Sequence, residues 1–180
     1  MAPVLVLAEH DRDSGAVKKN TLELLTIARR LGEPVCVWFG SGADQASSTL
    51  GEYGASAVYA ADSAEMTDHP VVPMVDVMTA LVEQLSPAAV LVPSSADGKE
   101  VAGRLAVRTA SGVITDAVDI DEHGVATQSV FGGSTIVHSK VTSGTPIFTV
   151  RPNSVPPEAA PTTCAVESVQ IAVSDLAKKA

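Results

Sequence analysis

The residues that combine suitable chemistry with suitable spacing for ligand binding are His10, Ser94, Ser95 and Gly98. His10 follows the first apolar run of the chain, and the other three lie in a small polar loop after a later apolar run. In open parallel sheets, ligands bind at the carboxyl ends of the strands, where helix N-termini offer free N–H groups to anions. The pattern therefore allows a nucleotide or anion cleft, although small polar residues in such a loop also serve simply to turn the chain and cap a helix.

This loop does not match the established phosphate-binding motifs. A phosphate loop needs a glycine five residues before Gly98 and a Ser or Thr after Lys99, but position 93 is Pro and position 100 is Glu. The segment after the first apolar run contains only Gly15, so the GxGxxG signature of dinucleotide binding is missing from it. We therefore predict that no phosphate loop or dinucleotide-binding turn is present.

No set of residues for catalysis or metal binding stands out. The four histidines fall in separate predicted elements: His10, His69, His123 and His138. There is no GxSxG motif, and neither Cys36 nor Cys164 has a CxxC or Cys/His spacing. The adjacent residues Glu9, His10 and Asp11 point in different directions, which disfavours a shared metal ion. We expect no catalytic residue, no metal site and a chain that is not itself an enzyme.

Apolar runs and helical periodicity alternate along the first part of the chain. Strands are predicted at residues 4–8, 34–39, 57–60 and 88–92, and helices at 20–31, 43–53, from Asp68-His69-Pro70 to Leu85, and at 100–110. Asn20 or Ser14 could cap the first helix. Such alternation specifies right-handed crossovers and a parallel sheet with helices on its faces. We predict an α/β fold with a Rossmann-like, three-layer parallel sheet of the adenine nucleotide alpha hydrolase kind.

The pattern changes after residue 112. Strands are predicted at residues 113–120, 125–131, 135–141 and 146–150, and the short turns between them favour an added antiparallel β layer. These strands carry many apolar residues for a side layer, which predicts a subunit interface or a second internal core. We assign residues 1–153 to the α/β domain, and the proline-rich residues 154–180 to an extended segment and linker.

Composition excludes several classes of partner. The chain has 180 residues, a formal net charge of −9 and a pI of about 4.7, and only 3% of its residues are aromatic. Such a chain repels nucleic-acid phosphates and anionic lipids, and it offers few rings on which bases could stack. The opening apolar run is too short to span a bilayer, and it carries no signal or transit peptide features. We expect a cytoplasmic protein that binds no nucleic acid and does not insert into a membrane.

Several blocks of the sequence resemble the amino-terminal domain of the alpha subunit of electron-transfer flavoproteins. These blocks are VLVLAEH at 4–10, Asn20-Thr21, Arg30-Leu31-Gly32, PSSADGKEVAGRLAVRTASGVITD at 93–116, FGGSTIVHSKV at 131–141 and FTVRPNS at 148–154. No single block is a catalytic signature, but their occurrence in this order is specific. The resemblance covers nearly the whole chain to about Asn153.

This resemblance implies a heterodimer of alpha and beta subunits that carries electrons through FAD. The donors would be acyl-CoA dehydrogenases, as in fatty acid β-oxidation, and other dehydrogenases; the acceptor would be a membrane quinone oxidoreductase or another respiratory-chain component. FAD is implied to lie mainly on a second, carboxyl-terminal domain of the alpha subunit, and AMP on the beta subunit only. Because this chain ends before the glycine-rich segment of that domain, we expect a truncated or split subunit in which residues 154–180 lead toward the missing flavin domain.

Two functions follow from these observations. The first is a scaffold domain that holds no cofactor itself, with electron transfer as the function of the complete protein. The alternative is a stand-alone adenine-nucleotide-binding module of the universal-stress or nucleotide-hydrolase type, which would use His10, Ser94, Ser95 and Gly98. Without its beta subunit, the chain is expected to self-associate through its antiparallel strands.

Overall fold

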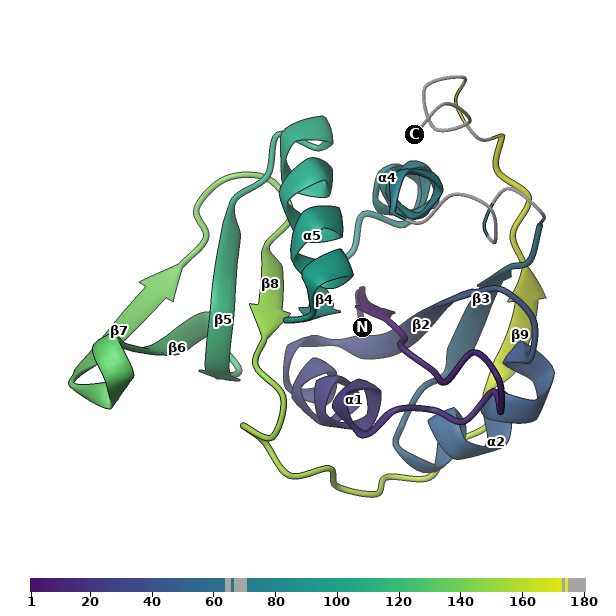
Figure 1. Cartoon of the computed structure of the whole chain (residues 1–180), viewed down its shortest axis with the longest axis horizontal. Helices are drawn as coiled ribbons and strands as arrows, with labels where there is room; N and C mark the ends of the chain where they lie inside the picture. Colours follow the sequence, from purple (N-terminus) through teal and green to yellow (C-terminus); the bar gives the residue numbers. More distant parts are fainter. Residues whose placement is uncertain (64–65, 67–70, 173, 175–180) are drawn as a thin grey trace.

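A computed structural model describes residues 1–63, 66, 71–172 and 174 of the chain. Within these residues, nine strands form one sheet in the order β7-β6-β5-β8-β4-β1-β2-β3-β9 (Figure 1). The strands are β1 (Pro3–Leu7), β2 (Glu33–Phe39), β3 (Ala57–Ala61), β4 (Ala89–Pro93), β5 (Val113–Ile120), β6 (Val125–Val130), β7 (Thr135–Lys140), β8 (Ile147–Val150) and β9 (Ala165–Ser168). The α-helices are α1 (Lys19–Leu31), α2 (Ala43–Glu52), α4 (Val72–Leu85) and α5 (Ala96–Arg108), and η1 (Phe131–Gly133) is a 3-10 turn.

The centre of the sheet is buried on both faces. Alternate residues of β1 point to opposite sides, so that Val4 and Val6 pack in one core cluster with α1 and α2, and Leu5 and Leu7 in a second cluster with α4 and α5. Burying each such side chain contributes about 1.5–3 kcal/mol. Strand β1 pairs in parallel with β2 on one side and β4 on the other. The prediction of a Rossmann-like three-layer α/β fold is therefore confirmed.

Helix starts differ from the sequence predictions in three places. Helix α1 starts after Lys18, and neither Asn20 nor Ser14 caps it: Ser14 bonds to Asp11 in the preceding turn, and the Asn20 amide donates to Glu9. Helix α5 begins at Ala96, four residues earlier than expected, because the Ser95 Oγ caps it by accepting the Gly98 N–H at 3.1 Å. The predicted helix start at Asp68-His69-Pro70 lies outside the described residues, and α4 begins at Val72.

The antiparallel pairing predicted for the strand at residues 146–150 is wrong. Strand β8 lies between β4 and β5 and runs parallel to both. Its four residues are all buried, and a strand covered on both faces belongs in the parallel core. Among the named strands of the described residues, antiparallel pairing joins β5 with β6 and β6 with β7, which extend one edge of the same sheet.

The hairpin of β6 and β7 projects from the body of the domain (Figure 1). Several of its apolar side chains face solvent: Phe131 is 83% exposed, Ile136 55% and Val137 36%. A folded chain seldom leaves such a patch uncovered unless another molecule binds there. The excess of apolar residues in these strands thus does not form a second internal core.

The segment after β8 crosses the outside of α1 and α2 and ends in β9 (Figure 1). Glu158 bonds to α1 twice, through its N–H to the Thr26 Oγ1 at 3.0 Å and through its carbonyl to the Arg29 guanidinium at 2.8 Å. The Thr162 N–H donates to the Gly51 carbonyl in α2 at 2.9 Å. We call residues 152–164 the strap. It leads into β9, which pairs in parallel with β3.

Close approach of the strap to α2 gives a test of its contribution to stability. A Cβ at position 51 would lie 2.8 Å from the Thr162 carbonyl oxygen and 3.1 Å from the Cys164 Cβ. Gly51→Ala should therefore lower the free energy of unfolding by about 1–3 kcal/mol, because backbone must move. Gly103→Ala is the matched control: it sits in α5 with nothing within 4 Å, so the gain in helix propensity should stabilise by about 0.5–1 kcal/mol. Urea unfolding measures both, and equal effects would contradict this account.

A buried ion pair joins α4, α5 and the end of the described chain. Asp76 of α4 is 8% exposed, pairs with the Arg108 guanidinium of α5, and accepts the Ser174 N–H at 2.9 Å. Burial alone would raise the pKa of Asp76, but the Arg108 hydrogen bond and the Ser174 contacts outweigh it and lower that pKa. The carboxylate is thus held in its charged form.

Acid should remove the stabilisation that this pair provides. Because the folded-state pKa of Asp76 is lowered, its contribution is complete above the ordinary value of 3.8 and is lost as pH falls through the folded-state value. Asp76→Asn should cost about 1–2 kcal/mol at pH 7, a modest figure because Arg108 is partly exposed, and the difference from the wild type should shrink below pH 3.8. Glu83→Gln, on an exposed site of the same helix, is the control and should leave urea unfolding unchanged at both pH values.

Candidate functional site

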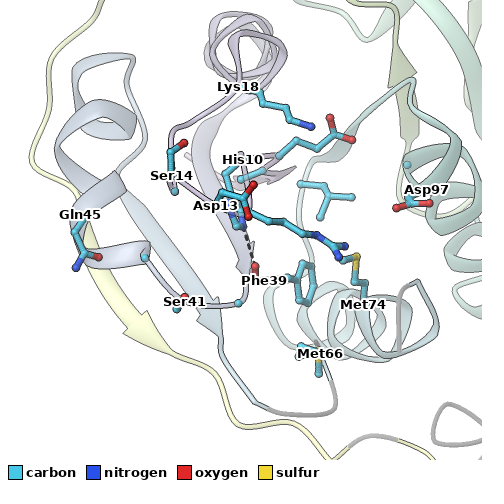
Figure 2. A pocket seen from close by; sticks show the side chains of 18 of the residues that line it. His10, Asp13, Ser14, Lys18, Phe39, Ser41, Gln45, Met66, Met74 and Asp97 are labelled. Atoms are coloured by element: carbon cyan, nitrogen blue, oxygen red, sulfur yellow. Dashed lines mark hydrogen bonds between the residues drawn. The ribbon is translucent and has the colours of Figure 1, made fainter. Parts of the chain in front are cut away.

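A cavity of about 630 Å³ opens at the carboxyl ends of β1 and β2, beside the first turns of α2 and α5 (Figure 2). This is the edge where the sequence predicts a ligand cleft. Apolar side chains, charged side chains and a glycine loop contribute to its lining. The lining residues are Leu7, Ala8, Glu9, His10, Arg12, Asp13, Ser14, Gly15, Lys18, Phe39, Gly40, Ser41, Gly42, Gln45, Met66, Met74, Asp97, Gly98 and Val101.

His10 is fixed in the cavity wall by stacking. Its ring lies parallel to the Trp38 indole, with a centroid distance of 4.0 Å and an interplanar angle of 7°. The His10 Nε2 donates to the Phe39 carbonyl at 2.9 Å, drawn as a dashed line in Figure 2, and the Trp38 Nε1 donates to the Ser41 carbonyl at 2.9 Å. Both rings thus have their polar atoms committed to the backbone, and His10 serves as part of the wall.

Glu9 joins three elements at the inner side of the cavity. Its Oε1 accepts the Ser95 hydroxyl at 2.5 Å and its Oε2 accepts the Asn20 amide at 2.7 Å. Its backbone N–H and carbonyl both bond to the Thr21 Oγ1, at 2.8 and 3.0 Å. The sequence analysis missed this role of Glu9 and Asn20, although a carboxylate directly after a buried strand is a signal that could have revealed it.

Charged side chains of both signs line the cavity. Arg12 and Lys18 make no ion pair with any described residue, and the carboxylates of Asp13 and Asp97 lie in the same lining. In Figure 2, Lys18 and Asp97 come from opposite sides, one from the segment before α1 and the other from α5. The cavity therefore combines apolar lining residues with charged side chains of both signs.

The four residues of the predicted cleft do not share one surface. His10 and Gly98 line the cavity. Ser95 does not line the cavity, but it bonds to Glu9 and to Gly98, which do. Ser94 turns to another network, where its hydroxyl donates to the Asp116 Oδ1 at 2.6 Å. Gly98 has no room for a side chain, because a Cβ there would meet the Pro93 carbonyl oxygen.

The network around Ser94 ties β4, β5 and β8 together. The Thr149 Oγ1 lies 2.8 Å from the Ser94 Oγ and accepts the Asp116 N–H at 2.9 Å, and Lys99 pairs with Asp116 at 3.0 Å. The Ser94 hydrogen bond, opposed by burial and aided by Lys99, lowers the pKa of Asp116. Asp116 has a φ of +53°, a strained conformation for a side chain other than glycine. It borders a second hollow of about 620 Å³ that Arg151 and Phe131 also line.

Replacing the buried hydroxyl of this network should destabilise the fold. Thr149→Val keeps the side-chain shape but leaves the Asp116 N–H without its acceptor, so the free energy of unfolding should fall by about 1–3 kcal/mol. Thr115→Val on β5 is the control, since that side chain is exposed and should change stability by less than about 0.5 kcal/mol. Urea unfolding of the two variants distinguishes them; a neutral Thr149→Val would mean that the network does not hold β5 to β8.

Metal and thiol chemistry find little support in the described parts of the chain. Among those residues, no group of three or more His, Cys, Asp or Glu side chains could hold a metal ion. Cys36 is fully buried, and burial raises the pKa of its thiol; burial also raises that of Cys164. Both thiols are therefore poor nucleophiles. The helices within the described ranges are also too short or too polar to cross a membrane.

Comparison with known proteins gives the family. The family model for the electron transfer flavoprotein domain matches residues 4–176. The chain belongs to this family. The electron transfer flavoprotein subunit alpha of Mycobacterium leprae is 44% identical over 182 residues, and that of Mycobacterium tuberculosis 43%; each alignment covers 100% of this chain and 56% of the relative. That of Bacillus subtilis is 29% identical over 183 residues, covering 96% of this chain and 55% of the relative.

These matches confirm the predicted resemblance to the alpha subunit of electron transfer flavoproteins. The chain spans about half the length of these curated relatives. Their family consists of electron carriers, which agrees with a role in electron transfer.

The charges of the cavity lining offer little net attraction to the diphosphate of a flavin dinucleotide. Glu9, Asp13 and Asp97 place three carboxylates around the cavity against the two cations Arg12 and Lys18, and Glu9 already takes the hydroxyl of the residue that caps α5. A diphosphate carries negative charge, so these carboxylates oppose its binding in this lining.

Proposed function

We propose that this chain is the scaffold domain of an electron transfer flavoprotein alpha subunit. The observation that carries the proposal is the family match over residues 4–176 together with alpha subunits more than 40% identical over the whole chain. The complete protein would be a cytoplasmic heterodimer with a beta subunit. Through FAD it would accept electrons from acyl-CoA dehydrogenases and other dehydrogenases, and would pass them to a quinone oxidoreductase or another respiratory-chain acceptor.

The chemistry of the described residues supports a scaffold. Electron transfer needs a carrier that can be oxidised and reduced reversibly, and protein chains obtain this from a cofactor. The buried Cys36, the half-buried Cys164 and the stacked Trp38 supply no such carrier, and the charges of the main cavity offer the flavin diphosphate little net attraction. FAD would therefore lie on another domain of the alpha subunit, and AMP on the beta subunit. The part of this domain would be to hold those components in position.

The exposed hairpin supplies the surface for the partner subunit in this proposal. Phe131 in η1 and Ile136 and Val137 in β7 are exposed apolar side chains, and we call these three residues the hairpin patch. Successive strand residues such as Ile136 and Val137 point to opposite faces of the sheet, so the hairpin patch spans both faces of the hairpin. Strand β7 is the last strand at its side of the sheet, so its outer backbone groups are free to pair. Aromatic and aliphatic side chains beside a free strand edge are suited to a permanent protein interface.

Charge placed on the hairpin patch should weaken binding of the beta subunit. We expect Phe131→Lys combined with Ile136→Lys to reduce co-purification with a tagged beta subunit at least tenfold, while the circular dichroism spectrum stays unchanged. Val107→Lys is the matched control, because Val107 on α5 is also 83% exposed but lies away from the hairpin. Equal retention of both variants would contradict the assignment of this surface.

The same variants test the isolated chain. Without its beta subunit, the wild type is expected to self-associate through the hairpin patch, which light scattering across a concentration series detects as a rising mass. The double variant should stay monomeric. A wild-type monomer at every concentration would refute self-association without affecting the heterodimer.

The alternative of a stand-alone nucleotide-binding module has one observation in its favour. His10 and Gly98 do line a cavity of suitable size at the carboxyl ends of the strands. That function requires the wild-type chain to bind AMP or ATP, and a saturating thermal shift with either nucleotide would support it over the scaffold.

A further inference from the structure

The N-terminus of α5 faces the main cavity, and the carboxylate of Glu9 lies beside it. Gly98 in the first turn of α5 lines the cavity, and its N–H donates to the Ser95 Oγ. The Ser95 hydroxyl in turn donates to the Glu9 Oε1 at 2.5 Å. Helix N-termini favour negative charge, and here a carboxylate from the end of β1 lies against the N-cap of α5 and accepts its hydroxyl.

The second oxygen of Glu9 is held as firmly as the first. The Asn20 amide donates to the Glu9 Oε2 at 2.7 Å, and in this orientation the Asn20 Oδ1 is buried without a hydrogen-bond partner among the described residues. Turning the amide over would place that oxygen against the carboxylate. The donor side of the Asn20 amide therefore faces Glu9.

The backbone of Glu9 fixes its side chain in place. Thr21 of α1 is fully buried, and its Oγ1 accepts the Glu9 N–H and donates to the Glu9 carbonyl. Glu9 is thus bonded to α1 at its main chain and at one carboxylate oxygen, and to the N-cap of α5 at the other. The carboxylate has little freedom to leave for an incoming anion.

We propose that Glu9 is the residue that determines what the cavity accepts: its carboxylate occupies the anion position at the N-terminus of α5 and excludes phosphate-bearing ligands. The nearby cations do not offset this, because Arg12 and Lys18 share the lining with Asp13 and Asp97. The inference goes beyond the scaffold function and does not depend on it. It predicts that the wild-type cavity binds phosphate-bearing ligands weakly.

Removing the resident carboxylate should create an anion site. In Glu9→Ala, the Ser95 hydroxyl and the Asn20 amide lose their acceptor and face the space that opens. We expect inorganic phosphate and AMP each to bind this variant at least tenfold more tightly than the wild type. Glu9→Gln should give a smaller gain, because it removes the charge but keeps the volume filled.

Asp13→Ala is the matched control. Asp13 lines the same cavity, but no described residue bonds to its carboxylate. The variant therefore removes the same charge without freeing any donor at the N-terminus of α5, and phosphate binding should remain as weak as in the wild type. Binding is measured by isothermal titration calorimetry and by the fluorescence of Trp38, the single tryptophan, which stacks on His10 in the cavity wall.

Three results would overturn the proposal. The first is a wild-type chain that binds phosphate or AMP as tightly as the Glu9 variants, an outcome that would also favour the nucleotide-binding module. The second is a folded Glu9→Ala or Glu9→Gln chain that binds neither probe. The third is an equal gain in Asp13→Ala. If Glu9→Ala does not fold, Glu9→Gln decides, and binding of the beta subunit tests the scaffold separately.

Discussion

Burial of the central strands on both faces is the constraint from which the rest of this structure follows. A strand such as β1 can be buried only if helices cover both sides, and its alternating residues divide between two core clusters. Covering both sides requires crossovers, and crossovers place the carboxyl ends of β1, β2 and β4 at one edge. The main cavity, the α5 N-cap and Glu9 all meet there because of this geometry.

Much of the fold was predictable because its signals are local. The apolar run Val4–Ala8 and the helical spacing of Leu22, Leu25 and Ala28 gave correct elements and the correct class. The position of β8 was not predictable in the same way. Its apolar residues indicate that it is buried. Which strands lie beside it depends on pairing with β4 and β5, and these strands are distant from it in the sequence. Strand β9 likewise depends on the strap crossing α1 and α2.

The candidate site was predictable only in outline. Its location followed from the rule for parallel sheets, and His10 and Gly98 do line the cavity. Ser95 caps a helix, a role that serine commonly has. Asn20 does not cap α1 but donates its amide to Glu9, a contact between two elements that the sequence does not reveal. Side-chain partners across elements leave no periodic trace in the sequence, so the Ser94, Asp116 and Thr149 network could not be found from it. For Glu9 the sequence does offer a signal, a carboxylate directly after a buried strand, but it does not name the partners.

The strap has a consequence for how the sheet can grow. Strand β9 covers β3 with only four residues, one of them the charged Glu167, whereas the opposite edge of the sheet ends in the longer β7, which carries the exposed Ile136 and Val137. Proteins that pair through both edges of a sheet can add to one another without limit and form filaments. Because the edge at β9 is short and charged, pairing of two chains through β7 would give a closed dimer, and this topology therefore disfavours polymerisation.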